Sequence, residues 1–399
     1  MNSVRNPTWP EEPYPLSFLT LRPLLILALI ALPCGCRRAT PPSFAPGPAV
    51  EELTAEVEDA EEREVLEELQ SQIAVKMRQV TGTPEKLILL GTEKTSDKLK
   101  LGYAVYSNYC TQCHGVNGDG NGPVAEHLNP KPRNYTMGVF KFTSTPYGSK
   151  PRRSDLMKTI QRGVTGTSMP SFDRFSPEQL EAVVDYVLAL TYRGQLESEL
   201  AAIAYDEEEL PDEEYLADVV AGILEPWSEA SGQIVMPASP MPPMTPETIA
   251  AGHEIFLTKA CNKCHGKYGR GGLAGGVDVG TDVWGHNAAA ADLSSGMFRG
   301  GDRFVDIYRR ITSGINGTPM PAFASMFEDD PDAIWHLVHF VKETGNRRRQ
   351  GKPPLSEADL PTELPSVEQA SEDDAEADVE EDAREGESEP SEDVQKKAA

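Results

Sequence analysis

Two short motifs of cysteine and histidine are the residues of this chain best suited to chemistry. CTQCH spans Cys110–His114 and CNKCH spans Cys261–His265. In each motif, two thiols three positions apart lie on one helical turn, where both can react with the vinyl groups at one edge of a porphyrin. The histidine that follows can then place an imidazole nitrogen on the iron. The motifs therefore predict two covalently bound c-type haems, each with an iron ligated by His114 or His265.

A methionine follows each motif at the same distance. Met169 lies 55 positions after His114, and Met320 lies 55 positions after His265. A thioether paired with histidine gives a saturated iron that passes electrons. We therefore predict Met169 and Met320 as the second axial ligands. The flanking sequences repeat at an offset of 151, in the pairs Ile160/Ile311, Gly163/Gly314, Gly166/Gly317, Thr167/Thr318, Pro170/Pro321 and Phe172/Phe323.

The remaining methionines and the cysteine spacing also allow other interpretations. Two cysteines at this spacing also occur in zinc sites and in thioredoxin-like pairs, but zinc needs two further ligands nearby and a redox pair follows a strand. The methionines between the prolines of residues 236–244 would suit copper, although a proline-rich spacer is the simpler interpretation. Four methionines lack a counterpart in the repeat and are predicted to serve packing: Met137, Met157, Met297 and Met326.

The charge of the chain, formally −26, is concentrated outside the two motif-bearing segments. Residues 195–245 carry 12 acidic and no basic side chains, and residues 350–399 carry 17 acidic and 4 basic ones, whereas residues 246–349 balance at 12 and 12. Acidic connectors would repel phosphate, so nucleic acid is not an expected partner. Low hydrophobicity with high charge also predicts that the connectors and the C-terminal tail are largely disordered.

The N-terminus resembles a secretion signal. Nine apolar residues, 24–32, are too few to span a bilayer but fit the hydrophobic region of a signal peptide. The sequence PCGC follows at 33–36, and Cys36 comes after the small residue Gly35, as in a bacterial lipoprotein signal, so we predict lipid attachment at Cys36. An uncleaved anchor and simple secretion are the alternatives. The chain is expected on the periplasmic side, held at a membrane surface.

Helical periodicity predicts an all-α fold of two domains. Leu66, Leu69, Ile73 and Met77 form one stripe of an acidic helix over about 50–80. Gly102 is expected at a close helix contact, and SPEQ at 176–179 reads as a capped helix start. The predicted boundaries are 1–36 signal peptide, 37–96 tether and acidic helix, 97–194 first domain, 195–245 acidic and proline-rich linker, 246–349 second domain, and 350–399 disordered tail.

Both motifs, both methionine loops and the flanking helices resemble the class I cytochrome c family. The chain looks like a di-haem member of it, over about 97–194 and 246–346. This resemblance implies two tandem all-α domains, each wrapping one haem between crossing terminal helices. The segments PKPRNY and GTSMPSF are similar in sequence to segments of lipoprotein cytochromes in bacterial respiratory chains. By analogy, this similarity implies electron transfer between a quinol-oxidising complex or dehydrogenase and a terminal oxidase.

The expected function is an electron carrier and not an enzyme, with unidentified redox proteins as donor and acceptor. A di-haem peroxidase or thiosulfate-oxidising enzyme is the first alternative. Such an enzyme needs an open or unusual iron site, for example one with cysteine ligation, and the motifs use every cysteine of the two domains. A haem subunit docked permanently in a larger oxidoreductase complex is the second alternative.

Overall fold

The computed structural model describes residues 42–55, 57–271 and 277–360. Its long elements are helical, and a hairpin of two very short strands, β1 (Gly82–Thr83) and β2 (Lys86–Leu87), accompanies them. The helices are α1 (Pro48–Glu52), α2 (Ala60–Thr81), α3 (Asp97–Tyr109), α4 (Thr111–His114), α5 (Arg153–Arg162), α6 (Pro177–Glu207), α7 (Glu213–Ala230), α8 (Pro246–Thr258), α9 (Asn262–His265), α11 (Phe304–Thr312) and α12 (Asp332–Arg349). The predicted helical fold class is confirmed.

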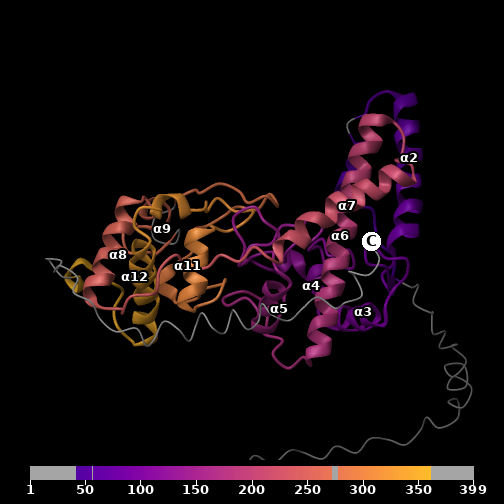
Figure 1. The fold of residues 1–399 in the computed structure, drawn as a ribbon. Helices are drawn as coiled ribbons and strands as arrows, with labels where there is room; N and C mark the ends of the chain where they lie inside the picture. Colours follow the sequence, from indigo (N-terminus) through magenta and orange to yellow (C-terminus); the bar gives the residue numbers. More distant parts are fainter. Residues whose placement is uncertain (1–41, 56, 272–276, 361–399) are drawn as a thin grey trace, which may run out of the picture. The chain divides into compact units, whose positions relative to one another are not determined.

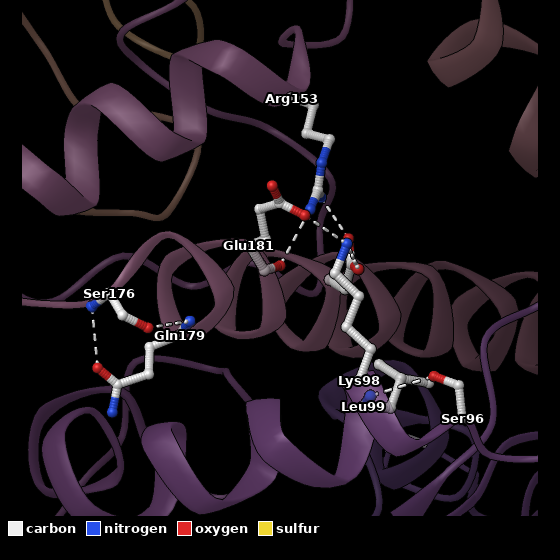
Figure 2. Close-up of polar contacts among 8 residues, drawn as sticks. Ser96, Lys98, Leu99, Arg153, Ser176, Gln179 and Glu181 are labelled. Atoms are coloured by element: carbon white, nitrogen blue, oxygen red, sulfur yellow. Dashed lines mark hydrogen bonds and ion pairs between the residues drawn. The ribbon is translucent and has the colours of Figure 1, made fainter. Parts of the chain in front are cut away.

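The first domain is built on the crossing of α3 and α6. Each helix begins at a serine cap: the Ser96 hydroxyl accepts the Leu99 amide, and the Ser176 hydroxyl accepts the Gln179 amide at 3.2 Å (Figure 2). The Gln179 side chain accepts the Ser176 amide in return, which completes the predicted capping box. At the crossing, a Cβ added to Gly102 would collide with the carbonyl oxygen of Ala182, so only glycine permits this approach.

The second domain repeats this crossing with α8 and α12. A Cβ added to Gly252 would collide with the carbonyl oxygen of His336 and lie 2.9 Å from the Cβ of Phe340. Phe256, one turn further along α8, is buried against Phe340 with ring centroids 4.9 Å apart. Tyr106 and Tyr186 make the equivalent contact in the first domain at 5.1 Å. The two crossings are therefore built on the same pattern of glycine and aromatic residues.

A third element meets each crossing, with different chemistry in the two domains. In the first, Lys98 of α3 lies 3.0 Å from Asp185 of α6, and Arg153 of α5 also pairs with Asp185. Figure 2 shows Lys98 and Arg153 converging on α6 near Glu181, whose carboxylate lies 2.8 Å from Lys98. These ion pairs join three segments that are distant in sequence.

At the matching positions of the second domain, the side chains are neutral. His339 of α12 is fully buried, and its Nδ1 lies 3.0 Å from the hydroxyl of Thr248 on α8. Phe304 of α11 meets the imidazole edge-on, with ring centroids 6.0 Å apart. Burial lowers the pKa of His339 to about 4, so the imidazole is neutral near pH 7.

The acidic segment before the first domain folds onto it. Leu66, Leu69, Ile73 and Met77 of α2 are buried, as the stripe predicted. They pack against Leu196 and Leu200 in the C-terminal part of α6 and against α7. Figure 1 shows α2 running alongside α7 and α6. The hydrophobic stripe thus decides the structure here in spite of the many acidic residues.

The linker differs from the prediction. Residues 195–207 continue α6, and α7 forms from Glu213. Leu196, Leu200 and Ala204 are buried, and the carboxylate of Asp212 accepts the Tyr215 amide at 2.8 Å as the cap of α7. The expected disorder is therefore wrong for most of 195–230, because the acidic side chains cap and solvate helices whose apolar faces are buried.

The proline-rich part of the linker and the first residues of the tail also pack onto the second domain. The Ser239 carbonyl accepts the Trp335 indole N–H at 2.8 Å, and the Val235 carbonyl accepts from Arg309. Leu355 is only 2% exposed in the second core. The predicted disorder is therefore wrong for these residues of the linker and of the tail. The predicted signal peptide and the tail beyond 360 lie outside the described residues.

Candidate haem-binding sites

The first attachment motif forms a single helical turn at the end of α3. Cys110 closes α3 and precedes α4, and its carbonyl accepts the amides of Cys113 at 3.1 Å and His114 at 2.9 Å. Both thiols are free and half-buried. Burial and the neighbouring Cys113 raise the pKa of Cys110 to about 12. The turn presents two thiols and one imidazole from five consecutive residues, which is the arrangement that covalent attachment requires.

The second motif has the same backbone. The Cys261 carbonyl accepts the amides of Cys264 at 3.3 Å and His265 at 3.0 Å. Burial raises the pKa of Cys261 to about 11, whereas Cys264 is exposed. Among the described residues, no cluster of three or more His, Cys, Asp and Glu side chains could hold a metal ion. The described residues therefore supply no further ligands for the zinc interpretation.

Each histidine is oriented by one backbone carbonyl. His114 Nδ1 lies 3.1 Å from the Arg133 oxygen, and His265 Nδ1 lies 3.0 Å from the Ala291 oxygen. A carbonyl can only accept, so Nδ1 carries the proton and Nε2 keeps its lone pair for a metal. Burial lowers the pKa of His114 to about 4 and also lowers that of His265. Both imidazoles are therefore neutral and suited to ligation, so these residues fit a covalently attached haem.

The loop after the first motif wraps closely around it. The amides of Gly120, Gly122 and Val124 donate to the carbonyls of His114, Cys113 and Gln112, respectively. A Cβ at Gly122 would collide with the Gln112 carbonyl, so the loop depends on glycine here. The Tyr106 hydroxyl donates to Gly115 at 2.9 Å. The loop after the second motif is described only in part, and there the Gly271 amide donates to His265.

The two methionine loops share one set of hydrogen bonds. Val164 donates to the Met169 carbonyl at 3.2 Å, and the Met169 amide lies 3.2 Å from the Thr167 hydroxyl. Ile315, Met320 and Thr318 repeat these contacts at 3.1 and 3.3 Å. Both methionines are half-buried. The repeat seen in the sequence is therefore a repeat of backbone structure that gives each methionine the same setting.

Other methionines lie in different settings. Met137, Met297 and Met326 are between 42% and 51% exposed, so the prediction that they serve packing is wrong for these three side chains. Met157 is half-buried on α5, and Met241 packs against the second core. Cys36, the predicted lipid-attachment residue, lies outside the described residues. Within the described part of the chain, no helix is long and apolar enough to cross a membrane.

Sequence reasoning missed the side chains that brace each histidine. Tyr135 stacks on His114 with ring centroids 4.8 Å apart and is itself buried. In the second domain, Phe256 tilts against His265 at 6.3 Å. The position of Phe256, four residues after Gly252, was a usable signal because helical neighbours at this spacing share a face. Tyr135 lies in an irregular segment, where no periodicity indicates it.

Family models match both motif-bearing segments of the chain. The cytochrome c family model matches residues 99–191, and the model for subunit III of cbb3-type cytochrome c oxidase matches residues 247–341. A solved chain of the Kuenenia stuttgartiensis reducing HAO-like protein complex is 32% identical, with 61% of this chain and 96% of that chain covered and a TM-score of 0.48. No curated protein matches. The chain belongs to the cytochrome c family as a di-haem electron-transfer protein, with two cytochrome c domains that imply two covalent c-type haems.

Proposed function

We propose that each haem is bound through the residues of its repeat. Cys110, Cys113, His114 and Met169 serve the first haem, and Cys261, Cys264, His265 and Met320 serve the second. The matched hydrogen bonds of the two methionine loops are the observation that carries this assignment. A bound haem supplies an iron that alternates between ferrous and ferric. The protein orients each imidazole through a carbonyl, keeps it neutral, and shields it with aromatic rings.

A redox titration of single-methionine variants tests the ligand assignment. Met169→Ala and Met320→Ala should each lower the potential of one haem, because a thioether stabilises the ferrous state. The expected shift in that haem's oxidation equilibrium is at least about tenfold, equivalent to about 59 mV for one electron. Met157→Ala and Met326→Ala are matched controls and should leave both potentials in place. Unchanged potentials in both ligand variants would reject the assignment.

We further propose that the chain carries single electrons from a quinol-oxidising complex or dehydrogenase to a terminal oxidase. A methionine available to each iron supports a carrier, because a saturated iron does not bind substrate. Membranes containing a terminal oxidase should oxidise the reduced protein at a rate that rises with its concentration. Rapid peroxide reduction by the purified protein would instead favour a di-haem enzyme.

Members of this family that carry c-type haem are extracytoplasmic, and we propose that this chain is held there by lipid on Cys36. The support is the short apolar stretch of residues 24–32 followed by PCGC at 33–36, in which Gly35 precedes Cys36. Cys36→Ser should release the haem protein from the membrane fraction into the soluble fraction. Cys34→Ser is the matched control and should leave it bound. Equal release by both variants, or by neither, would contradict lipid attachment at Cys36.

A further inference from the structure

The described N-terminal segment makes a specific contact with the first haem loop. Asn117, in the loop that follows CTQCH, is only 9% exposed. Its side-chain oxygen accepts the Ala45 amide at 3.1 Å, and its side-chain nitrogen donates to the Ala45 carbonyl at 3.0 Å. This reciprocal pair joins residues 72 positions apart in the sequence. Residues 44–53, which include this contact and α1, are called the strap below.

The strap also covers a buried ion pair on α6. Arg193 and Glu197 form a two-pronged contact at 3.1 and 3.0 Å, and the two residues are only 4% and 5% exposed. The Phe44 ring lies 4.2 Å from the Arg193 guanidinium carbon, and a Cβ at Gly47 would lie 2.7 Å from a Glu197 carboxylate oxygen. A buried charge pair is costly unless water is excluded and partners are in place. The strap helps to provide that dry environment.

A short chain of contacts links the strap to the predicted iron ligand. Asn117 is followed by Gly118, whose carbonyl accepts the Tyr135 amide at 2.8 Å. Tyr135 stacks on the His114 imidazole. Phe44 packs against the same hydrophobic cluster that contains Tyr106 and Tyr135. The strap therefore supports the loop and the aromatic ring that shield the first site from water.

The loop after the second motif is held differently. Lys267, two residues after His265, pairs with Glu357 at 3.1 Å, with the two side chains 51% and 84% exposed. An exposed pair of this kind contributes little, because water and salt screen it. The buried His253 of α8 also holds this loop, since its Nε2 lies 3.0 Å from the Lys267 carbonyl. The two sites provide an internal comparison within one molecule.

We propose that the strap is a positioning element that raises the reduction potential of the first haem. The ferric state carries one more positive charge than the ferrous state, so a drier environment disfavours it and raises the potential. Asn117 holds the strap from the haem loop, and Phe44 holds it by packing over the Arg193–Glu197 pair. This inference rests on the proposed His114 and Met169 ligation of the first haem.

The test measures how one electron divides between the two haems of the full-length protein. In the protein that carries one electron, Asn117→Ala and Phe44→Ala should each raise the ratio of reduced second haem to reduced first haem by about threefold or more. A wetter first site binds the electron less tightly. The second haem's own potential should stay fixed. Hydrogen exchange at the Ala45 amide reports independently whether the strap has loosened. Two substitutions at separate ends keep the test decisive if one variant folds poorly.

Three controls separate positioning from general destabilisation. Ser43→Ala changes an exposed neighbour and should leave the division of the electron unchanged. Phe44→Tyr keeps the aromatic ring and should keep the wild-type division. Glu357→Gln should leave the potential of the first haem unchanged. The methionine-to-iron band checks that ligation is intact, so failure of the ligand assignment is distinguishable. A loosened strap with an intact band and an unchanged division of the electron would overturn the proposal.

Discussion

The junction of three helices is ionic in the first domain, where Lys98, Arg153 and Asp185 meet, and neutral in the second, where Thr248, Phe304 and His339 meet. The two sets correspond, because Lys98 and Thr248 each lie four residues before the crossing glycine, and Asp185 and His339 each precede the aromatic residue at that crossing. Both domains therefore require the two crossing helices to approach closely at a glycine, although the side chains of the junction differ. The side chains around it can stabilise the junction by different means.

The largest expected effect comes from breaking that shared requirement. Gly102→Ala forces a methyl group into the Ala182 carbonyl, and Gly252→Ala does the same at His336. Overpacking against the backbone costs about 3 kcal/mol, a large fraction of the free energy of unfolding of a small domain. Each variant should therefore retain one covalent haem out of two, as measured by haem content per chain. Gly222→Ala, at an open position on α7, is the control. Full haem content in both crossing variants would refute this account of the fold.

Acid should destabilise the second domain more than the first. His339 has a pKa near 4 in the folded chain, below its ordinary 6.5, so only the unfolded chain takes up the proton between these values. Its stabilising contribution is complete above about pH 6.5 and is lost as pH falls through about 4, a change of about 3 kcal/mol. Burial lowers the pKa of His253 as well, which acts in the same direction.

Hydrogen exchange measures this pH effect within one molecule. Amides of α12 should lose protection relative to those of α6 as the pH is lowered from 7 to about 4. His339→Phe should flatten the difference, whatever it does to stability at neutral pH. Parallel loss of protection in both helices, unaltered by the substitution, would show that the histidine junction is not the acid-labile one.

The ionic junction should respond to salt, with the smallest effect of the three. Asp185→Asn leaves Lys98 and Arg153 facing one another without their shared partner. These side chains are partly exposed, so the expected cost is about 1 kcal/mol and should shrink as salt is added. Thermal unfolding of the first domain at low and high salt measures it. Thr248→Val in the second domain is the control, and its cost should not depend on salt.

Structural features that depend on the internal repeat or on helical periodicity could be predicted from the sequence. The two attachment motifs, the capped α6 and the buried stripe of α2 follow from local spacing, and the structure contains each of these elements. The helical linker was not predicted, because its 12 acidic residues indicated disorder. The helical spacing of Leu196, Leu200 and Ala204, which are buried, was the better signal. The strap was missed because Ala45 and Asn117 pair across 72 residues, and nothing local indicates such a contact.

The methionine-to-iron charge-transfer band of the ferric protein tests the central claim most directly. If Met169 and Met320 each ligate one iron, the wild-type band has the intensity of two haems, either alanine variant has half of it, and the double variant has none. Met157→Ala should keep the full band. A wild-type band with the intensity of one haem, or a band that remains in the double variant, would contradict the claim that the two domains ligate their irons in the same way.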